Sequence, residues 1–449
     1  MGLGAALAGL GFLLGSCQYG NRPAPAALHE ARPQPVTPSS ALAAQGAAAI
    51  LTAAAAADGG QLAAAAPAAA APDGGAHAAA LPQLPAVKLG GPVPMARLDS
   101  QRTGRSPYLI PMQAPREVWR FQAQGAVVAA PTVAADGTVL FTSHDRHVYA
   151  LAADGTLRWK YQTGDFVWSS AALASGDLVL LGSDDDQLHA LRLTDGEKAW
   201  ALKPGGCRRA TGRGPEAARC DIEDVTLGPD GTFYISGDGV YAVEPTGTVR
   251  WRFVPEPDQQ RKRHCGSAPT LGRDGAVYAV CSDQLYALNP DGSRRWQLEA
   301  PGEFDSAPAI GADGTLYLGD EQRKLIGVDP AGQLRFSFVV GGAVRSAPAV
   351  RSDGLIVFGA YDGVLYALKP DGTLAWSFAT ADSIGSSPLV DSAGAVLVGS
   401  RDNRLYAVAA DGRLRWSVVL DDDVDGTPAL GPDGTIYVGS DDRALHAFR

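Results

Sequence analysis

The chain has 449 residues, a formal net charge of -10 and a hydrophobic share of 46%. The acidic balance argues against a general nucleic-acid binder, because such proteins neutralise phosphates with lysine and arginine. The 54 glycines and 31 prolines indicate many turns, and the length permits either one closed repeat body or several average domains.

Residues 1–16 are apolar and too short to span a membrane, which is typical of a targeting segment. The run LLGSC, which ends at Cys17, resembles the cleavage box of bacterial lipoproteins. This resemblance implies a signal peptide over residues 1–16 and lipidation of Cys17; an ordinary secretory signal is the alternative. Because Gln18 replaces the aspartate that would resemble an inner-membrane retention signal, we expect an exported protein anchored to the outer membrane.

Residues 17–115 are rich in alanine and proline and contain few large apolar side chains. Such a segment cannot offset its ordering entropy by burying a core, so we expect a disordered tether. Two interpretations are open: the segment holds the folded part away from a membrane, or it is dispensable low-complexity sequence.

Repeats begin after this segment, and each carries one large aromatic anchor. The anchors are Trp119, Trp159, Trp200, Trp251, Trp296, Phe336, Trp376 and Trp416, spaced about 40 residues apart except around Trp251. Each unit, such as residues 346–376, reads as four short strands separated by Asp-Gly turns. The pattern predicts propeller blades, with each anchor filling the gap between neighbouring blades.

The count of units predicts how the ring closes. Seven units end in an anchor, whereas residues 427–449 supply three strands only. The missing outer strand is available around Trp119, and pairing it with the last strands leaves no free sheet edge. We therefore predict an all-β, eight-bladed propeller of four-stranded antiparallel blades over residues 116–449, present as a monomer.

The periodic tryptophan and the segment ALRLTDGEKAW at residues 190–200 resemble the pyrroloquinoline quinone repeat. Two branches share this repeat: quinoprotein dehydrogenases, which bind the quinone and Ca2+, and non-catalytic eight-bladed lipoproteins such as the scaffold of the outer-membrane β-barrel assembly machinery. Resemblance to the first branch implies an adjacent cysteine pair, a catalytic aspartate and calcium ligands. The chain has no adjacent cysteines, and most of its aspartates belong to repeated turns, so we expect neither catalysis nor a bound cofactor.

Two acidic runs are candidate metal sites. Asp421, Asp423 and Asp425 precede Gly426 in the order typical of a calcium loop, but Pro432 stands where that loop ends in glutamate. A solvated acidic loop is the favoured interpretation, with bound Ca2+ as the alternative. The run 184–186 is a weaker candidate.

Four cysteines lie where the 40-residue spacing fails. In an exported protein, two disulfides, Cys207 with Cys220 and Cys265 with Cys281, are the economical pairing, and a four-cysteine zinc site is the alternative.

The two insertions next to these cysteines are basic in an acidic chain, and we interpret them as a partner-binding patch; solvated loops without a ligand are the alternative. The candidate residues are Arg208, Arg209, Arg213, Arg219, Arg261, Lys262 and Arg263. The sequence therefore predicts a non-enzymatic, lipid-anchored scaffold of the cell envelope that binds a protein partner. A quinoprotein dehydrogenase and a carbohydrate- or peptide-binding propeller are the alternatives.

Overall fold

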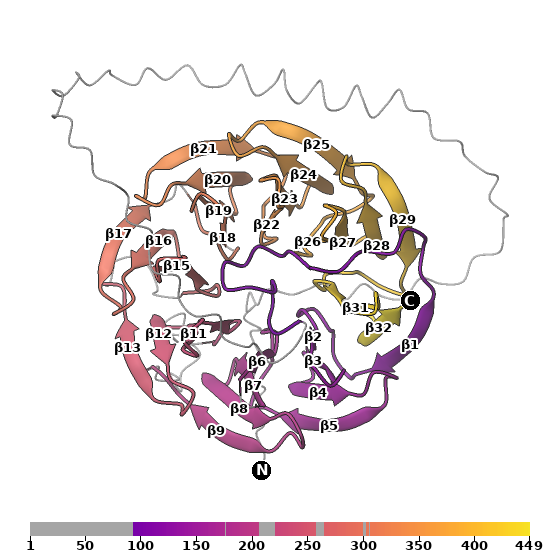
Figure 1. Ribbon diagram of the computed structural model, residues 1–449, viewed down its shortest axis with the longest axis horizontal. Helices are drawn as coiled ribbons and strands as arrows, with labels where there is room; N and C mark the ends of the chain where they lie inside the picture. The colour runs from indigo at the N-terminus through magenta and orange to yellow at the C-terminus, as the bar shows by residue number, and fades with distance from the viewer. Residues whose placement is uncertain (1–92, 176, 206–220, 257–264, 300–301, 305) are drawn as a thin grey trace, which may run out of the picture. The chain divides into compact units, whose positions relative to one another are not determined.

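The computed structural model describes residues 93–175, 177–205, 221–256, 265–299, 302–304 and 306–449. These residues form 32 strands in eight four-stranded antiparallel sheets, which stand around a ring as blades (Figure 1). The predicted all-β, eight-bladed propeller is confirmed. Within the described ranges, no helix is long and apolar enough to cross a membrane.

The strands of a blade differ in position and burial. The innermost strands are short and buried: β2 (Thr132–Val133), β6 (Ala172–Ala174), β10 (Thr226–Leu227), β14 (Thr270–Leu271), β18 (Ala309–Ile310), β22 (Ala349–Val350), β26 (Leu389–Val390) and β30 (Ala429–Leu430). The second strands are apolar on both faces: β3 (Val139–Ser143), β7 (Leu178–Ser183), β11 (Phe233–Ser236), β15 (Val277–Cys281), β19 (Leu316–Gly319), β23 (Ile356–Gly359), β27 (Val396–Ser400) and β31 (Ile436–Gly439). Both classes are buried because a neighbouring blade covers each face of the sheet.

Towards the outside of the ring, the third strands stay buried, whereas the outer strands alternate between exposed and partly buried positions. The third strands are β4 (His147–Leu151), β8 (Gln187–Arg192), β12 (Val240–Val243), β16 (Gln284–Leu288), β20 (Lys324–Val328), β24 (Val364–Leu368), β28 (Arg404–Val408) and β32 (Ala444–Phe448). The outer strands are β1 (Glu117–Gln122), β5 (Leu157–Gln162), β9 (Lys198–Leu202), β13 (Val249–Phe253), β17 (Arg294–Glu299), β21 (Leu334–Val339), β25 (Leu374–Ala379) and β29 (Leu414–Val419). The core is therefore divided among the blade interfaces: one cluster, for example, joins Val357 of β23 to Val398 of β27.

The ring closes in the eighth blade, as predicted. Strand β1 pairs with β32, and the order of this sheet is β1-β32-β31-β30. Arg116 and Arg449 exchange two backbone hydrogen bonds of 2.8 Å beyond the strand ends. The buried imidazole of His446 adds a side-chain link, because its Nδ1 lies 2.8 Å from Glu117 and its Nε2 lies 2.8 Å from Asp442. Closure thus joins the first and last strands of the propeller in one sheet.

The aromatic anchors lie between successive blades. The ring of Trp119 lies over Gly155, in the last turn of the next blade, where a Cβ atom would stand 2.7 Å from the ring. Gly155 also has a φ of +85°, so both space and backbone conformation require glycine. The Trp119 indole donates a hydrogen bond of 3.0 Å to the carbonyl of Ala153, and Trp251 donates in the same way to Pro290.

Two tryptophan anchors do not donate this hydrogen bond to the last turn of the next blade. Trp416 donates to the carbonyl of Pro111, 2.8 Å away, which lies before the first strand. At Trp376 the expected acceptor, the carbonyl of Ala410, instead accepts a 2.7 Å hydrogen bond from Arg351. The Trp376 indole nitrogen has no partner among the described residues.

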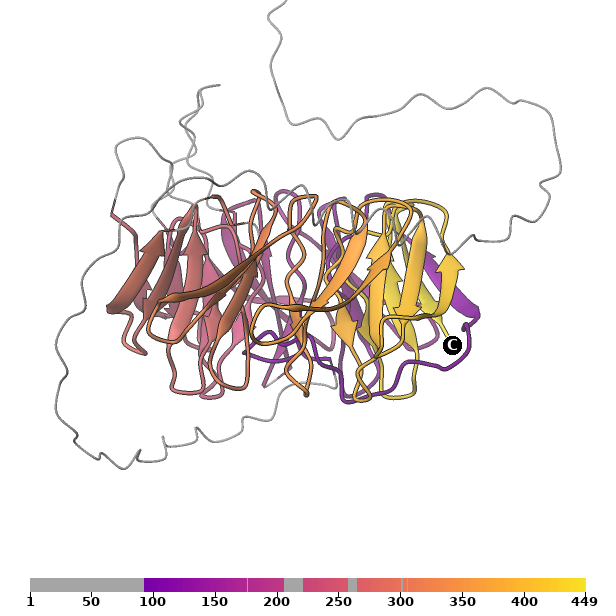
Figure 2. The ribbon, with the colours of Figure 1, turned by 90° about the horizontal axis from the view of Figure 1, so that it is seen from above.

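The predicted start of the propeller at residue 116 is too late. Residues 93–112, which we call the axial segment, cross the ring on one face and run along the lower side of Figure 2. Carbonyls of Pro94, Ser100, Gln101, Thr103 and Gly104 accept hydrogen bonds of 2.6–3.0 Å from innermost strands of blades 2, 4, 5, 6 and 7. The sequence of this segment has no strand pattern, and these hydrogen bonds hold it in one conformation. Residues 17–92, the rest of the tether expected over residues 17–115, lie outside the described residues.

Arg97 is a buried charge of the axial segment. Its guanidinium donates 2.6 Å hydrogen bonds to the carbonyls of Pro348 and Pro388, which precede the innermost strands of blades 6 and 7. Burial, together with repulsion from Arg102, lowers the pKa of Arg97 to about 9, so the group still carries its charge at neutral pH. Arg97 and Arg102 also have positive φ angles, which are uncommon for residues other than glycine.

Candidate functional site

The face opposite the axial segment carries the side chains that differ most from blade to blade. It contains the turns between second and third strands and the loops that lead into the innermost strands. We call its charged and aromatic residues the rim. The rim residues are His144, Phe166, Trp168, Glu321, Arg345, Tyr361, Arg401, Asp425 and Asp441. These turns and loops therefore present unlike side chains around the axis.

Three rim residues from blades 6 and 7 form a stack. The guanidinium carbons of Arg345 and Arg401 lie 4.8 and 5.1 Å from the ring centroid of Tyr361. Arg345 contacts Glu321 at 2.6 Å and Arg401 contacts Asp425 at 2.8 Å, so each cation is also held by a carboxylate. Cation–π contacts and paired charges fix the orientation of this stack while the arginines stay partly exposed.

The acidic loop considered as a weak calcium candidate has carboxylates that bind different partners. Asp421 accepts a 2.6 Å hydrogen bond from Arg120 on β1, whereas Asp425 is bound by Arg401 on blade 7. Burial and the neighbouring carboxylates raise the pKa of Asp423, and the same causes raise the pKa of Asp441 to about 6. No three acidic, histidine or cysteine residues in the described ranges are placed to hold one metal ion. Calcium binding at this loop stays an untested alternative.

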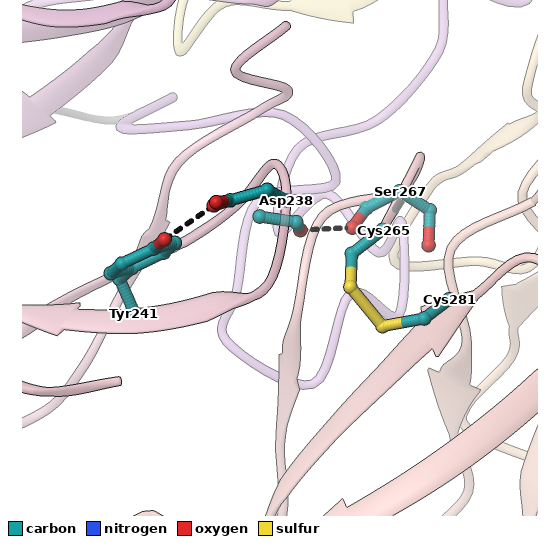
Figure 3. The surroundings of a disulfide bond; sticks show 6 residues. Asp238, Tyr241, Cys265, Ser267 and Cys281 are labelled. Carbon is teal, nitrogen blue, oxygen red and sulfur yellow. Dashed lines mark hydrogen bonds between the residues drawn. A yellow bond between two sulfur atoms is a disulfide. The ribbon is translucent and has the colours of Figure 1, made fainter. Parts of the chain in front are cut away.

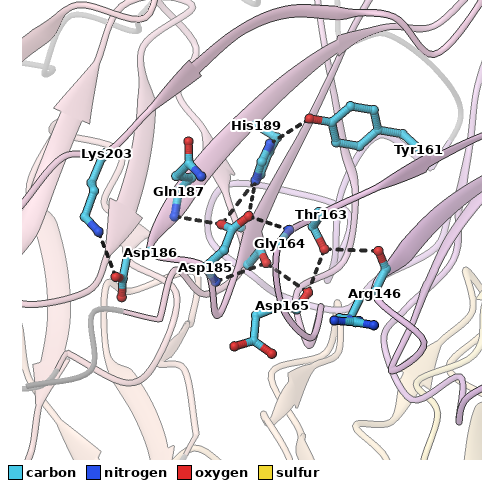
Figure 4. A network of polar contacts seen from close by, with 12 residues as sticks. Arg146, Tyr161, Thr163, Gly164, Asp165, Asp185, Asp186, Gln187, His189 and Lys203 are labelled. Atoms are coloured by element: carbon cyan, nitrogen blue, oxygen red, sulfur yellow. Dashed lines mark hydrogen bonds and ion pairs between the residues drawn. The ribbon is translucent and has the colours of Figure 1, made fainter. Parts of the chain in front are cut away.

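The second acidic run also has structural partners. The Asp185 carboxylate lies 3.0 Å from Nε2 of His189 and accepts hydrogen bonds from the backbone nitrogens of Gly164 and Gln187 (Figure 4). Asp186 binds the ammonium of Lys203 at 2.9 Å. In blade 6, Asp362 occupies the turn position that Asp185 has in blade 2. It accepts hydrogen bonds from the hydroxyl of Tyr366 and from the backbone nitrogen of Gly341, so it joins the turn to the preceding loop.

On the other side of the axis the rim is aromatic. The imidazole of His144 lies with its ring centroid 3.8 Å from that of Trp168 and 6.3 Å from that of Phe166. Burial lowers the pKa of His144 to about 4, so its ring is neutral at pH 7. Phe166 and Trp168 are 48% and 46% exposed. Aromatic side chains exposed to this extent are the residue type that dominates protein interfaces.

The structure describes only some of the residues predicted to form sites. Cys265 and Cys281 form the predicted disulfide, between the loop into β14 and the end of β15 (Figure 3). Cys17, Cys207, Cys220 and the seven basic residues of the insertions lie outside the described residues. The chain re-enters the described ranges at Asp221 and at Cys265.

Sequence reasoning missed the rim and the axial segment. A signal for the rim was present, since the position after Val167, Val344 and Val424 holds Trp168, Arg345 and Asp425 in otherwise similar blades. No comparable signal exists for Arg97 or Arg102. Their burial depends on carbonyls and a carboxylate of distant blades, including Asp224 at 3.0 Å from Arg102.

Comparison with known structures shows the fold. A europium-containing methanol dehydrogenase superposes with a TM-score of 0.63 at 16% identity, covering 78% of this chain and 89% of that chain. The quinohemoprotein alcohol dehydrogenase from Comamonas testosteroni gives 0.65 at 15% identity, covering 79% and 80%. BamB from Moraxella catarrhalis gives 0.59 at 15% identity, covering 75% and 99%.

Sequence comparison identifies a family. No curated protein matches the chain. The family profile described as outer membrane protein assembly factor BamB matches residues 47–211, 236–329, 282–383 and 361–449, which is most of the sequence. The chain therefore belongs to the BamB-like family of pyrroloquinoline-quinone-type propellers.

Proposed function

We propose that this chain is a non-catalytic scaffold of the bacterial cell envelope, anchored by lipid at Cys17, whose rim binds a protein partner. The family named for an outer-membrane assembly factor supports the envelope role. The observation that carries the proposal is the rim itself. It combines exposed Phe166 and Trp168 with the ordered Arg345–Tyr361–Arg401 stack, and aromatic and arginine side chains are enriched at protein interfaces.

The rim residues do not fit the quinone and Ca2+ that the dehydrogenase branch binds. Glu321 and Asp425, the carboxylates beside the stack, are each held by an arginine, and a cation at the same oxygens would compete with that pairing. The described cysteines join the loop into β14 to the end of β15 and are not adjacent in sequence. We therefore assign no chemical step to these residues.

The proposal is tested by crosslinking and mass spectrometry of the full chain in its native envelope. The double variant Phe166→Ser, Trp168→Ser removes the exposed aromatic surface and is expected to lower partner recovery about tenfold or more. The matched control, Leu374→Ser with Val419→Ser, changes side chains of similar exposure on the outer strands and leaves recovery unchanged. Equal recovery from both double variants would argue against the rim.

The basic insertions provide a second test. We propose that they contribute to the same partner surface, because loops on a rigid scaffold commonly carry specific contacts. Reversing Arg208, Arg209, Arg261 and Arg263 to glutamate should weaken the crosslinks and reduce their salt dependence. Unchanged crosslinks would remove the insertions from the proposal.

The enzymatic alternative is tested separately. The purified chain is mixed with pyrroloquinoline quinone and Ca2+, and the quinone absorbance and alcohol oxidation are measured. We expect neither an absorbance change nor turnover. A saturable absorbance change together with substrate oxidation would overturn the assignment as a scaffold.

A further inference from the structure

A pocket of about 490 Å³ opens between blades 3 and 4 on the face that carries the axial segment. Its walls are Pro229 and Asp230 in the first hairpin of blade 3, Arg273 to Gly275 in that of blade 4, and the side of Tyr234. Ser100 and Gln101 of the axial segment form its inner edge. The volume lies within the range of small-molecule sites.

The pocket exists because of the path of the axial segment. Backbone hydrogen bonds join the segment to blade 2 through Pro94 and to blade 4 through Ser100, but between these residues the chain turns inward. The Leu227 nitrogen of blade 3 therefore faces the Met95 sulfur at 3.5 Å instead of a carbonyl. This step in the path leaves the first hairpins of blades 3 and 4 uncovered.

Charges around the pocket are paired with one exception. Asp230 is bound by Arg250 at 3.1 Å, and Asp274 is bound by Arg295. Arg273 has no partner among the residues that the structure describes. In the other blades this hairpin position holds a small residue: Ala135, Ser175, Pro229, Ala312, Ser352, Ser392 or Pro432. The arginine is therefore not required by the fold and leaves one guanidinium available to an anion.

The axial segment supplies neutral hydrogen-bonding groups to the same pocket. The Gln101 Nε2 donates to Ser100 Oγ at 3.0 Å and to the Leu271 carbonyl at 3.2 Å. This orientation leaves Gln101 Oε1 to accept a hydrogen bond and the Ser100 hydroxyl hydrogen to donate one. Burial raises the pKa of Tyr234 to about 12, with Asp230 adding to the shift, so its hydroxyl is neutral.

We propose that this pocket binds a small organic carboxylate that carries hydroxyl or amino groups. The carboxylate pairs with Arg273, whose planar fork suits two parallel hydrogen bonds. A hydroxyl or amino group of the ligand donates to Gln101 Oε1, and Pro229 and Tyr234 cover its apolar side. Two aspartates in the wall disfavour a dianion such as phosphate, so a single negative charge fits. The site is on the face opposite the rim and is independent of the scaffold proposal.

The test is titration calorimetry on the full chain with two matched pairs of probes. Galacturonate is compared with galactose, and alanyl-alanine with its amide, so that each pair differs in the carboxylate. At least one carboxylate should bind with a dissociation constant of about 1 mM or tighter, and the match that lacks the carboxylate should bind at least about tenfold more weakly. If neither carboxylate binds at a ligand concentration on the order of 10 mM, the proposal is overturned.

Variants then locate the site. Arg273→Ala installs a residue that blades 1 and 5 already carry at this position, so folding is preserved, and it should weaken the carboxylate about tenfold or more. Arg273→Lys keeps the charge but loses the fork and should give an intermediate loss. Arg413→Ala, a control at an exposed arginine of blade 7, should leave binding unchanged. Equal binding by Arg273→Ala and the wild-type chain excludes the pocket as the site.

Discussion

Arg97 of the axial segment and the two arginines of the rim stack are held by different kinds of group. On the axial face, Arg97 is buried and bonded to backbone carbonyls of two blades, so it belongs to the fold. On the rim, Arg345 and Arg401 are partly exposed and paired with side chains that change from blade to blade. Arg97, which is held by backbone carbonyls, therefore serves stability, whereas the two rim arginines stay partly exposed and accessible to a partner.

The largest expected effect is on the axial face. Arg97→Met leaves the Pro348 and Pro388 carbonyls buried without their donors, and should lower the free energy of unfolding by about 3 kcal/mol. Urea denaturation measures the change. Arg401→Met on the rim is the matched substitution, and a loss there as large as at Arg97 would contradict the distinction between the faces.

The rim side has one covalent link among the described residues. Removing the Cys265–Cys281 disulfide, which closes a loop with a sequence separation of 16, should destabilise the chain by about 2 kcal/mol. The double variant Cys265→Ser, Cys281→Ser is compared with the wild-type chain by urea denaturation, with and without reductant. If reductant lowers the stability of the double variant as much as that of the wild type, the disulfide is not responsible.

The closing blade should respond to pH. Burial acts against protonation of His446, but hydrogen bonds to Asp442 and Glu117 outweigh it and raise the pKa of the imidazole. The stabilisation is complete below the ordinary histidine value of 6.5 and is lost as the pH rises through the raised pKa. We therefore expect a lower free energy of unfolding above that pKa than at pH 6.

The control for this prediction is His446→Gln, which keeps a polar side chain but does not titrate. Its unfolding free energy should lack the loss between pH 6 and the raised pKa. An identical pH dependence in the variant and the wild type would assign the effect to another group.

The smallest expected effect separates two anchors that lie on neither face. Trp251→Phe removes a 2.8 Å hydrogen bond to Pro290, whereas Trp376→Phe removes an indole nitrogen that has no described partner. The first should cost up to about 1 kcal/mol more than the second. Thermal unfolding of both variants checks the difference, and equal losses would mean that the indole hydrogen bonds add nothing to anchor packing.

Much of the fold followed from the repeat. The anchor spacing and the incomplete last unit predicted eight blades closed by β1 and β32, and the hairpin about Asp274 predicted the Cys265–Cys281 bond. These features depend on contacts that are local or recur in every blade. The acidic run at Asp421 was harder to interpret, because Arg120 and Arg401 approach it from other blades.

The sequence by itself determined the blade, because alternation, turn glycines and one large anchor act within about 40 residues. Only the tertiary structure decided the order of residues 93–112, the convergence of the rim and the pocket beside Arg273. The physical reason is the range of the contacts: Arg97 is bonded to a carbonyl 291 positions away, and no local pattern encodes such a partner.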